Sequence, residues 1–230
     1  MPTYLYGLIL SHNATRIGDG SDDWMTGIEG GRLRAIACGS LAALVSDVER
    51  VPSRSSLDDI RAHDAALRAV VASGVTVVAS RFGQLFADDA DACRDIAQHA
   101  SRVERLLGEY DGCVEMRVLL AQAGGDSEPA ATETVAAESE FAPGRAYLEQ
   151  LRARAALAAE RLPRISLAEA LGPMVRRERV ELLANEAGVV VSHLIPRDRE
   201  SAYRASVAEL PALSGARVIG PLPLYGFSDE

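Results

Sequence analysis

The side chains best suited to acid–base chemistry near neutral pH are the four histidines, His12, His63, His99 and His193, which are far apart in the sequence. His63 is followed directly by Asp64. Such a pair can bind a metal ion when further His and Asp ligands on an all-helical scaffold complete the site, and the sequence provides neither. We therefore expect His63 to lie on the surface of a helix beside an acidic residue, and we expect no metal site.

Motifs of common catalytic and cofactor sites are missing from the sequence. It contains no HExxH, GxSxG or GxGxxG motif and no EF-hand loop. Residues 18–23 include the acids of a calcium loop without its spacing or its closing Glu, so a solvated loop is expected. All 24 basic residues are arginine, which excludes a Schiff base with pyridoxal phosphate and a P-loop lysine. We expect no cofactor and assign no catalytic residue.

Arg81 follows directly on a run of branched apolar residues, 75–79, that predicts a buried strand. A buried guanidinium is costly unless it is paired, so we expect Arg81 to bind a carboxylate or backbone carbonyls near the core. Arg81 would then hold the domain together, an interpretation that we prefer to anion binding.

The segment 220–227, with the sequence GPLPLYGF, is the second feature that suggests more than a surface loop. Its two prolines exclude a central strand but suit an edge strand or a rigid extended tail. An exposed segment of this kind would be a strip for docking a partner, whereas a packed one would only hold the C-terminus in place. The sequence leaves both alternatives open.

Net charge and cysteine content narrow the choice of partners and compartment. The 33 acidic and 24 basic residues give a formal charge of −9, which argues against nucleic acid or an anionic membrane surface as a partner. The three cysteines, Cys38, Cys93 and Cys113, form no CxxC pair, so all are expected to be reduced and buried. The N-terminus lacks the basic region of a signal peptide, and no apolar run approaches the ~18 residues of a membrane span. The sequence predicts a soluble, cytoplasmic protein.

The apolar pattern divides the chain near residues 110–112 into two α+β domains, residues 1–110 and 111–230. The first half has the predicted order β-β-β-α-β-α. Its strands are expected at 4–10, 32–38, 41–48 and 75–79, and its helices begin at caps formed by Ser56 and Asp88. The second helix keeps one apolar period as far as Tyr110.

The second half opens with a strand at 114–118 whose apolar residues alternate with Glu115 and Arg117, the pattern of a half-buried strand. Residues 123–142 are acidic and poor in large apolar side chains, so we interpret them as a solvated, mobile insertion. The later elements are a helix that carries Tyr147, a helix from Ser166 towards Asn185, a strand at 188–195, a helix at 201–210 and a strand at 216–220. This order is close to a ferredoxin-like arrangement, short of one strand.

Five pieces of the chain, in the same order over nearly its whole length, resemble the GvpL/GvpF family of gas vesicle accessory proteins. They are Tyr4–Gly7, the strand Ala42–Asp47, His63-Asp64 with Leu67, Arg81–Gly83 and the closing segment Gly220–Phe227. That segment is similar to the family's terminal Gly-Pro-Trp-Pro-Pro-Tyr-x-Phe, with Leu222 and Leu224 where Trp and Pro are usual.

The resemblance implies a non-enzymatic role in forming gas vesicles, the hollow protein shells that give microbes buoyancy. It implies two α+β domains, the second a modified ferredoxin-like fold with a variable insertion. It also implies association with the gas vesicle in the cytoplasm and binding to the small apolar shell subunit and to other accessory proteins. The residues that we expect to be structural or to contact a partner are Arg81, Phe82, Gly83, Gly220, Pro221, Tyr225 and Phe227.

A small-molecule enzyme or sensor is the alternative function, with its ligand near Arg81 between the two domains. The fold class does not exclude it, because α+β scaffolds carry many functions. A deep pocket that brings Arg81, His63 and Asp64 together would favour this alternative, and scattered positions would count against it.

Overall fold

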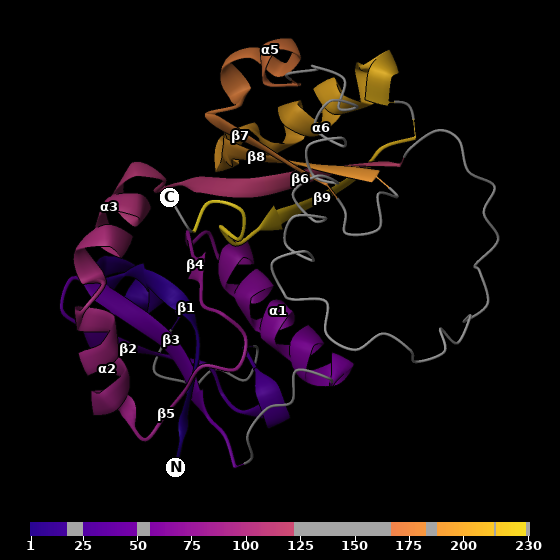
Figure 1. Ribbon diagram of the computed structural model, residues 1–230. Helices are drawn as coiled ribbons and strands as arrows, with labels where there is room; N and C mark the ends of the chain where they lie inside the picture. The colour runs from indigo at the N-terminus through magenta and orange to yellow at the C-terminus, as the bar shows by residue number, and fades with distance from the viewer. Residues whose placement is uncertain (18–24, 50–55, 122–166, 183–187, 214, 229–230) are drawn as a thin grey trace, which may run out of the picture.

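The structure, a computed structural model, describes residues 1–17, 25–49, 56–121, 167–182, 188–213 and 215–228. Within these residues the chain forms two antiparallel sheets with helices packed against them (Figure 1). The α+β class expected from the sequence is confirmed. The predicted insertion at 123–142, the predicted helix that carries Tyr147 and the loop at 18–23 lie outside the described residues.

The first sheet has the strand order β2-β3-β1-β4, and the short strand β5 also pairs with β1. Its strands are β1 (Thr3–Leu10), β2 (Arg34–Cys38), β3 (Leu41–Asp47), β4 (Val78–Ala79) and β5 (Leu85–Phe86). The two-residue turn Gly39-Ser40 joins β2 to β3 in a hairpin. The strand predicted at 75–79 is shorter than expected, because only Val78 and Ala79 pair with β1.

Helices pack against both faces of this sheet. The elements are α1 (Leu57–Ala72), α2 (Asp89–Ala97) and α3 (Ala100–Glu109), with the 3-10 turns η1 (Ser11–Arg16) and η2 (Ile28–Gly30). The hydroxyl of Ser56 caps α1 by accepting a hydrogen bond from the Asp59 amide (3.2 Å). Because neighbouring residues of a strand point to opposite faces, Tyr4 and Tyr6 pack with α1, whereas Leu5 packs with α2 and α3.

The single helix expected from Asp88 to Tyr110 is wrong, because the chain forms two helices there. Asp88 does cap the first of them, since its Oδ1 accepts a hydrogen bond from the Asp91 amide (2.8 Å). The backbone leaves helical geometry at His99, with φ −121° and ψ 5°, and α3 begins at the next residue. The apolar period continues across this break, which is why the sequence pattern did not reveal it.

The second sheet has the strand order β7-β8-β6-β9. Its elements are β6 (Cys113–Ala121), α5 (Leu167–Leu171), η3 (Gly172–Met174), β7 (Arg177–Leu182), β8 (Gly188–Pro196), η4 (Arg197–Arg199), α6 (Glu200–Glu209), η5 (Pro211–Leu213) and β9 (Arg217–Leu222). The chain order β6-α5-β7-β8-α6-β9 is the βαββαβ order of ferredoxin-like folds. The strand that the sequence pattern lacked is β7.

The helix expected from Ser166 towards Asn185 is therefore wrong beyond its first turns. α5 ends at Leu171, Gly172 adopts a left-handed φ of +60°, and Pro173 cannot continue an α-helix. The chain then extends into β7, which pairs with β8 from Arg177 opposite Leu194 onwards. The Gly172-Pro173 dipeptide ends the α-helix.

The expectation that all three cysteines are reduced is also wrong. Cys38, at the end of β2, and Cys93, in α2, form a disulfide with a Cα–Cα distance of 5.1 Å. The two residues are 55 positions apart in the sequence and come together because α2 packs against β2. Cys113 is free and buried, as expected.

The two sheets share hydrophobic clusters rather than having separate interiors. One cluster contains Tyr6 of β1 together with Met116 of β6, and a second contains Leu5 of β1 together with Leu194 of β8. Helices α1 and α3 and the C-terminal segment lie where the two sheets meet (Figure 1). The domain boundary between residues 110 and 111 stays a prediction.

Candidate functional site

The C-terminal segment that follows β9 is packed between the two sheets. Leu224 and Phe227 are buried, as is Leu222 at the end of β9. The Leu224 amide donates a hydrogen bond to the Val77 carbonyl (2.9 Å), and the ring of Phe227 packs edge-on against Tyr110 at 6.4 Å between centroids. Of the two alternatives that the sequence left open, the structure shows the packed one.

Glu115 of β6 is the buried carboxylate that binds this segment. Its side chain is 0% exposed, although the alternation of β6 predicted that it would face solvent. One carboxylate oxygen accepts a hydrogen bond from Arg117 Nε (2.6 Å) and the other from the Gly226 amide (2.7 Å). The C-terminal segment covers the face of β6 that the sequence pattern assigned to water.

Tyr225 connects the segment to α1. Its hydroxyl donates a hydrogen bond to Asp64 Oδ1 (2.8 Å), and Asp64 Oδ2 pairs with Arg68 Nε (2.5 Å). The Arg117 guanidinium lies 5.6 Å from the centre of the Tyr225 ring, within the range of a cation–π contact. Burial, with the nearby Asp64 charge, raises the pKa of Tyr225 far above its usual range, so the hydroxyl stays protonated and keeps donating.

Two further arginines bind carbonyl oxygens of the same segment. Arg179 Nη1 donates to the Gly226 carbonyl (2.5 Å), and Arg102 Nη2 donates to the Ser228 carbonyl (3.3 Å). Side chains from α1, α3, β6 and β7 therefore all contact residues 225–228. The segment therefore makes contacts with both sheets and helps to hold them together.

Gly220 and Pro221, at the end of β9, are held at close range by the strand beside them. A Cβ atom on Gly220 would lie 2.5 Å from Met116 Sδ and 3.0 Å from the Glu115 carbonyl, and the φ of +146° favours glycine. The Gly220 carbonyl also accepts a hydrogen bond from Arg204 of α6. Because Gly220 has no side chain, β9 can lie close to Met116 and Glu115 of β6 at this point, directly before the buried C-terminal segment.

Arg81 does not take the position predicted for it. Its side chain is exposed, and within the described residues it makes no ion pair, so the expectation of a buried, paired Arg81 is wrong. Arg197, directly after β8, is a partly buried arginine that does join the two halves. Its Nη1 donates to the Val71 carbonyl in the last turn of α1 (2.7 Å) and its Nη2 to the Val75 carbonyl just after the helix (3.3 Å), and burial lowers its pKa. The same signal, an arginine after a buried strand, was available in the sequence.

His63 lies in an aromatic cluster with Tyr4, Tyr6 and Phe82 rather than on the helix surface. It is 6% exposed, its ring stacks on Tyr6 at 5.4 Å, and its Nδ1 lies 3.0 Å from the Tyr4 hydroxyl. The Gly83 amide donates to the same hydroxyl (3.0 Å), so Phe82 and Gly83 belong to this cluster. Burial lowers the pKa of His63 to about 4 and raises that of Tyr4 to about 12, so both are neutral at pH 7.

A second buried polar cluster was missed by sequence reasoning. His193 of β8 lies within hydrogen-bond distance of the Tyr203 hydroxyl (2.6 Å, Nδ1) and of Glu178 Oε2 (2.8 Å, Nε2). Glu178 also accepts a hydrogen bond from the Ala168 amide (2.7 Å). His193 and Tyr203 are fully buried, and burial lowers the pKa of His193. The cluster ties α5 and α6 to the sheet, and only Glu178 among its three side chains is partly exposed.

The side chains of the three residues of the alternative ligand site have different surroundings and different partners. His63 is enclosed by aromatic rings, Asp64 binds Tyr225 and Arg68, and Arg81 is exposed. In the described part of the chain, no three His, Cys, Asp or Glu side chains gather as metal ligands. Nor does any described helix have the length and apolar character needed to cross a membrane.

With this geometry established, comparison with known proteins decides the family. A model of the gas vesicle synthesis protein GvpL/GvpF family matches residues 2–229. The chain belongs to this family. Gas vesicle protein F2 of Halobacterium salinarum is 26% identical over 233 residues, which cover 98% of this chain and 91% of that protein.

Two crystal structures of GvpF share the fold. The chain is similar to GvpF from Microcystis aeruginosa with a TM-score of 0.69 and 15% identity, covering 99% of this chain and 98% of that one. It is similar to GvpF from Anabaena sp. PCC7120 with a TM-score of 0.66 and 14% identity, covering 99% and 95%. The resemblance drawn from short sequence pieces is confirmed, and the GvpL/GvpF family gives the protein a role in gas vesicles.

Proposed function

We propose that this member of the GvpL/GvpF family is a non-catalytic assembly factor that binds the small apolar shell subunit and other accessory proteins during gas vesicle formation. It would act in the cytoplasm and at the gas vesicle. Family membership over residues 2–229 is the observation that carries the proposal. The structure adds support, because Asp64 and Tyr225 bind each other, as do Glu115 and Gly226, and these contacts hold the fold together.

The physical need for such a factor follows from the chemistry of its partner. A small, very apolar subunit with open strand edges aggregates before it assembles. A partner with a net charge of −9 that covers those surfaces keeps the complex in solution by charge repulsion. Binding rather than catalysis is then the required activity.

The contact surface that we propose lies at the start of α1. Leu57 and Ile60 are 64% and 39% exposed, and residues three apart on a helix share a face. Further along the same helix, Leu67 and Val70 are buried in the core. This packing fixes α1 on the protein and so fixes the position of the exposed pair Leu57 and Ile60. We assign the shell subunit as the occupant of this surface.

The C-terminal segment has a structural rather than a docking role in this proposal. Leu224 and Phe227 are buried in a cluster that contains residues of both halves of the chain, and Leu222 is buried as well, so they could meet a partner only after unpacking. Tyr225 and Gly226 are bound by Asp64 and Glu115. The alternative enzyme or sensor is not supported, because its three expected residues face different surroundings.

The test is co-expression with the shell subunit followed by co-purification. We expect the full chain to keep the subunit soluble and to elute with it. The double variant Leu57→Ser/Ile60→Ser should lose at least half of the bound subunit, whereas Val180→Ser, which changes an exposed apolar residue of β7, should not.

Two outcomes would overturn parts of this proposal. If the wild-type chain never associates with the shell subunit, the assembly role loses its mechanism. If the wild type associates and the α1 double variant retains full binding while remaining folded, the contact surface lies elsewhere. Circular dichroism of each variant separates loss of binding from loss of structure.

A further inference from the structure

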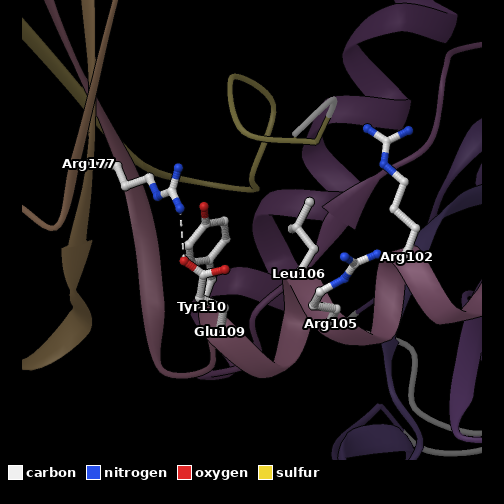
Figure 2. Close-up of a pocket in the computed structure, with 6 residues that line it drawn as sticks. All are labelled: Arg102, Arg105, Leu106, Glu109, Tyr110 and Arg177. Carbon is white, nitrogen blue, oxygen red and sulfur yellow. Dashed lines mark hydrogen bonds and ion pairs between the residues drawn. The ribbon is translucent and has the colours of Figure 1, made fainter.

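A hollow of about 430 Å³ lies between α3 and β7, away from the proposed shell-binding surface. Figure 2 shows its lining, which consists of Arg102, Arg105, Leu106, Glu109, Tyr110 and Arg177. Its volume is within the range of about 300–1,000 Å³ found for ligand sites. Three guanidinium groups face one carboxylate here, on a protein whose net charge is −9.

The charges of the hollow can accept an incoming anion at little cost. Both side chains of the Arg177–Glu109 ion pair (3.0 Å) are exposed to solvent. Exposed ion pairs contribute only about 0–1 kcal/mol to stability. The Arg177 guanidinium lies 5.6 Å from the centre of the Tyr110 ring, which holds it at the edge of the hollow. Arg105 is exposed and forms no ion pair with any residue that the structure describes.

The arginines are spread along the hollow rather than converging on one point. Arg102, Arg105 and Glu109 lie on one face of α3 at intervals of three and four residues, a span of about 10 Å. In Figure 2, Arg177 stands at one end and Arg102 at the other, with Arg105 between them. A single phosphate needs convergent donors, whereas an extended peptide repeats its side chains on one face about every 7 Å.

We propose that this hollow binds an acidic, extended peptide segment of a partner protein, with its carboxylates against Arg105, Arg102 and Arg177. This contact is distinct from the apolar contact proposed on α1, because it selects negative charge rather than apolar surface. Tyr110 and Leu106 form the floor on which the peptide backbone lies. Since charge provides the attraction, binding weakens as salt is raised.

The experiment measures binding of a fluorescein-labelled octaglutamate peptide to the full chain by fluorescence anisotropy. We expect saturable binding that weakens at least about tenfold in Arg105→Glu, because a like charge replaces a pairing cation. The matched control Arg94→Glu changes net charge equally at an exposed position of α2 and should stay within about twofold of wild type. An octaglutamine peptide should not bind.

Four results would overturn the proposal. The first is no binding of octaglutamate to the folded wild-type chain. The second is equal weakening by Arg105→Glu and Arg94→Glu, which would mean a general charge effect. The third is competition by inorganic phosphate at the peptide's own concentration, which would make the hollow a site for small free anions. The fourth is binding only in Asp229→Asn/Glu230→Gln, which would make the chain's own acidic end the occupant.

Discussion

The backbone amide of Gly226 donates a 2.7 Å hydrogen bond to the carboxylate of Glu115, a side chain with no exposure to solvent. The two residues are 111 positions apart, and the bond fixes the end of the chain on the face of β6. Arg117 balances the buried charge from the other carboxylate oxygen. Several expected outcomes depend on this arrangement and on its neighbours.

Replacing Glu115 should destabilise the protein more than its position in an alternating strand implies. We expect Glu115→Ala to lower the free energy of unfolding by about 3–5 kcal/mol, because Arg117 and the Gly226 amide lose their shared partner in a buried setting. Urea denaturation measures this. Asp198→Asn, at an exposed acid, is the control and should change stability by less than about 0.5 kcal/mol. An equally small effect at Glu115 would refute the role of its carboxylate.

Gly220→Ala should destabilise the protein by at least about 2 kcal/mol. The added Cβ would lie 2.5 Å from Met116 Sδ and 3.0 Å from the Glu115 carbonyl, at a positive φ that alanine rarely adopts, so the Met116 side chain must shift and the backbone is strained. Gly108→Ala is the matched control, because nothing lies within 4 Å of its Cβ and alanine favours the helix by about 1 kcal/mol. Thermal melts of the two variants should shift in opposite directions, and a shared direction would contradict the argument.

Arg197→Ala should cost about 2–3 kcal/mol of stability, because one carbonyl in the last turn of α1 and one just after the helix lose a charged donor. Arg81→Ala, the exposed counterpart after the other strand, should change stability by less than about 0.5 kcal/mol. Chemical denaturation of both variants under one condition gives the comparison. A larger loss at Arg81 would restore the role that the sequence assigned to it.

Reduction should destabilise the protein through the Cys38–Cys93 bond. Closing a loop of this length constrains the unfolded chain, and the chain-entropy account gives about 4 kcal/mol for the 55-residue separation. We expect dithiothreitol to lower the melting temperature of the wild type and to leave Cys93→Ser unchanged. Equal melting with and without reductant, once mass spectrometry shows the oxidised form, would contradict this.

Stability should fall as pH decreases from about 6.5 to about 4. The folded pKa of His63 is about 4 against 6.5 in the unfolded chain, so the unfolded state binds more protons in that interval. The difference between the two pKa values of His63 contributes about 3 kcal/mol to the free energy of unfolding. This contribution is complete above pH 6.5 and is lost as the pH falls towards 4. Denaturation at several pH values should show a shallower profile for His63→Phe, with the remainder from His193.

Local sequence patterns were sufficient for most elements of the first half of the chain. The apolar run of β1 and the caps at Ser56 and Asp88 are decided by neighbours within a few residues, so sequence predicts them. The break before α3 was not predicted, because the apolar period continues across it. The start of β7 was not predicted, because a Gly-Pro pair can either kink a helix or end it, and the local sequence does not decide between the two.

The candidate site was predictable as a set of conspicuous residues but not as an arrangement. Glu115 alternates with apolar residues like any exposed strand residue, and only the returning C-terminal segment makes it buried. His63 likewise stands beside an acid, yet Tyr4 and Tyr6 from another element enclose it. Both errors come from contacts between distant parts of the chain, which no local period records.

Because Gly226 is synthesised long after Glu115, the contact between them forms late in folding on the ribosome. Residues 224–228 leave the ribosome after every other described element of both sheets, so the emerging chain holds the β6 face and the ring of Tyr110 without their final cover. Folding of the first sheet can precede this step, whereas the contacts that residues 224–228 themselves make between the two sheets cannot. The contacts of residues 224–228 therefore complete the packing between the two sheets only after those elements have been made.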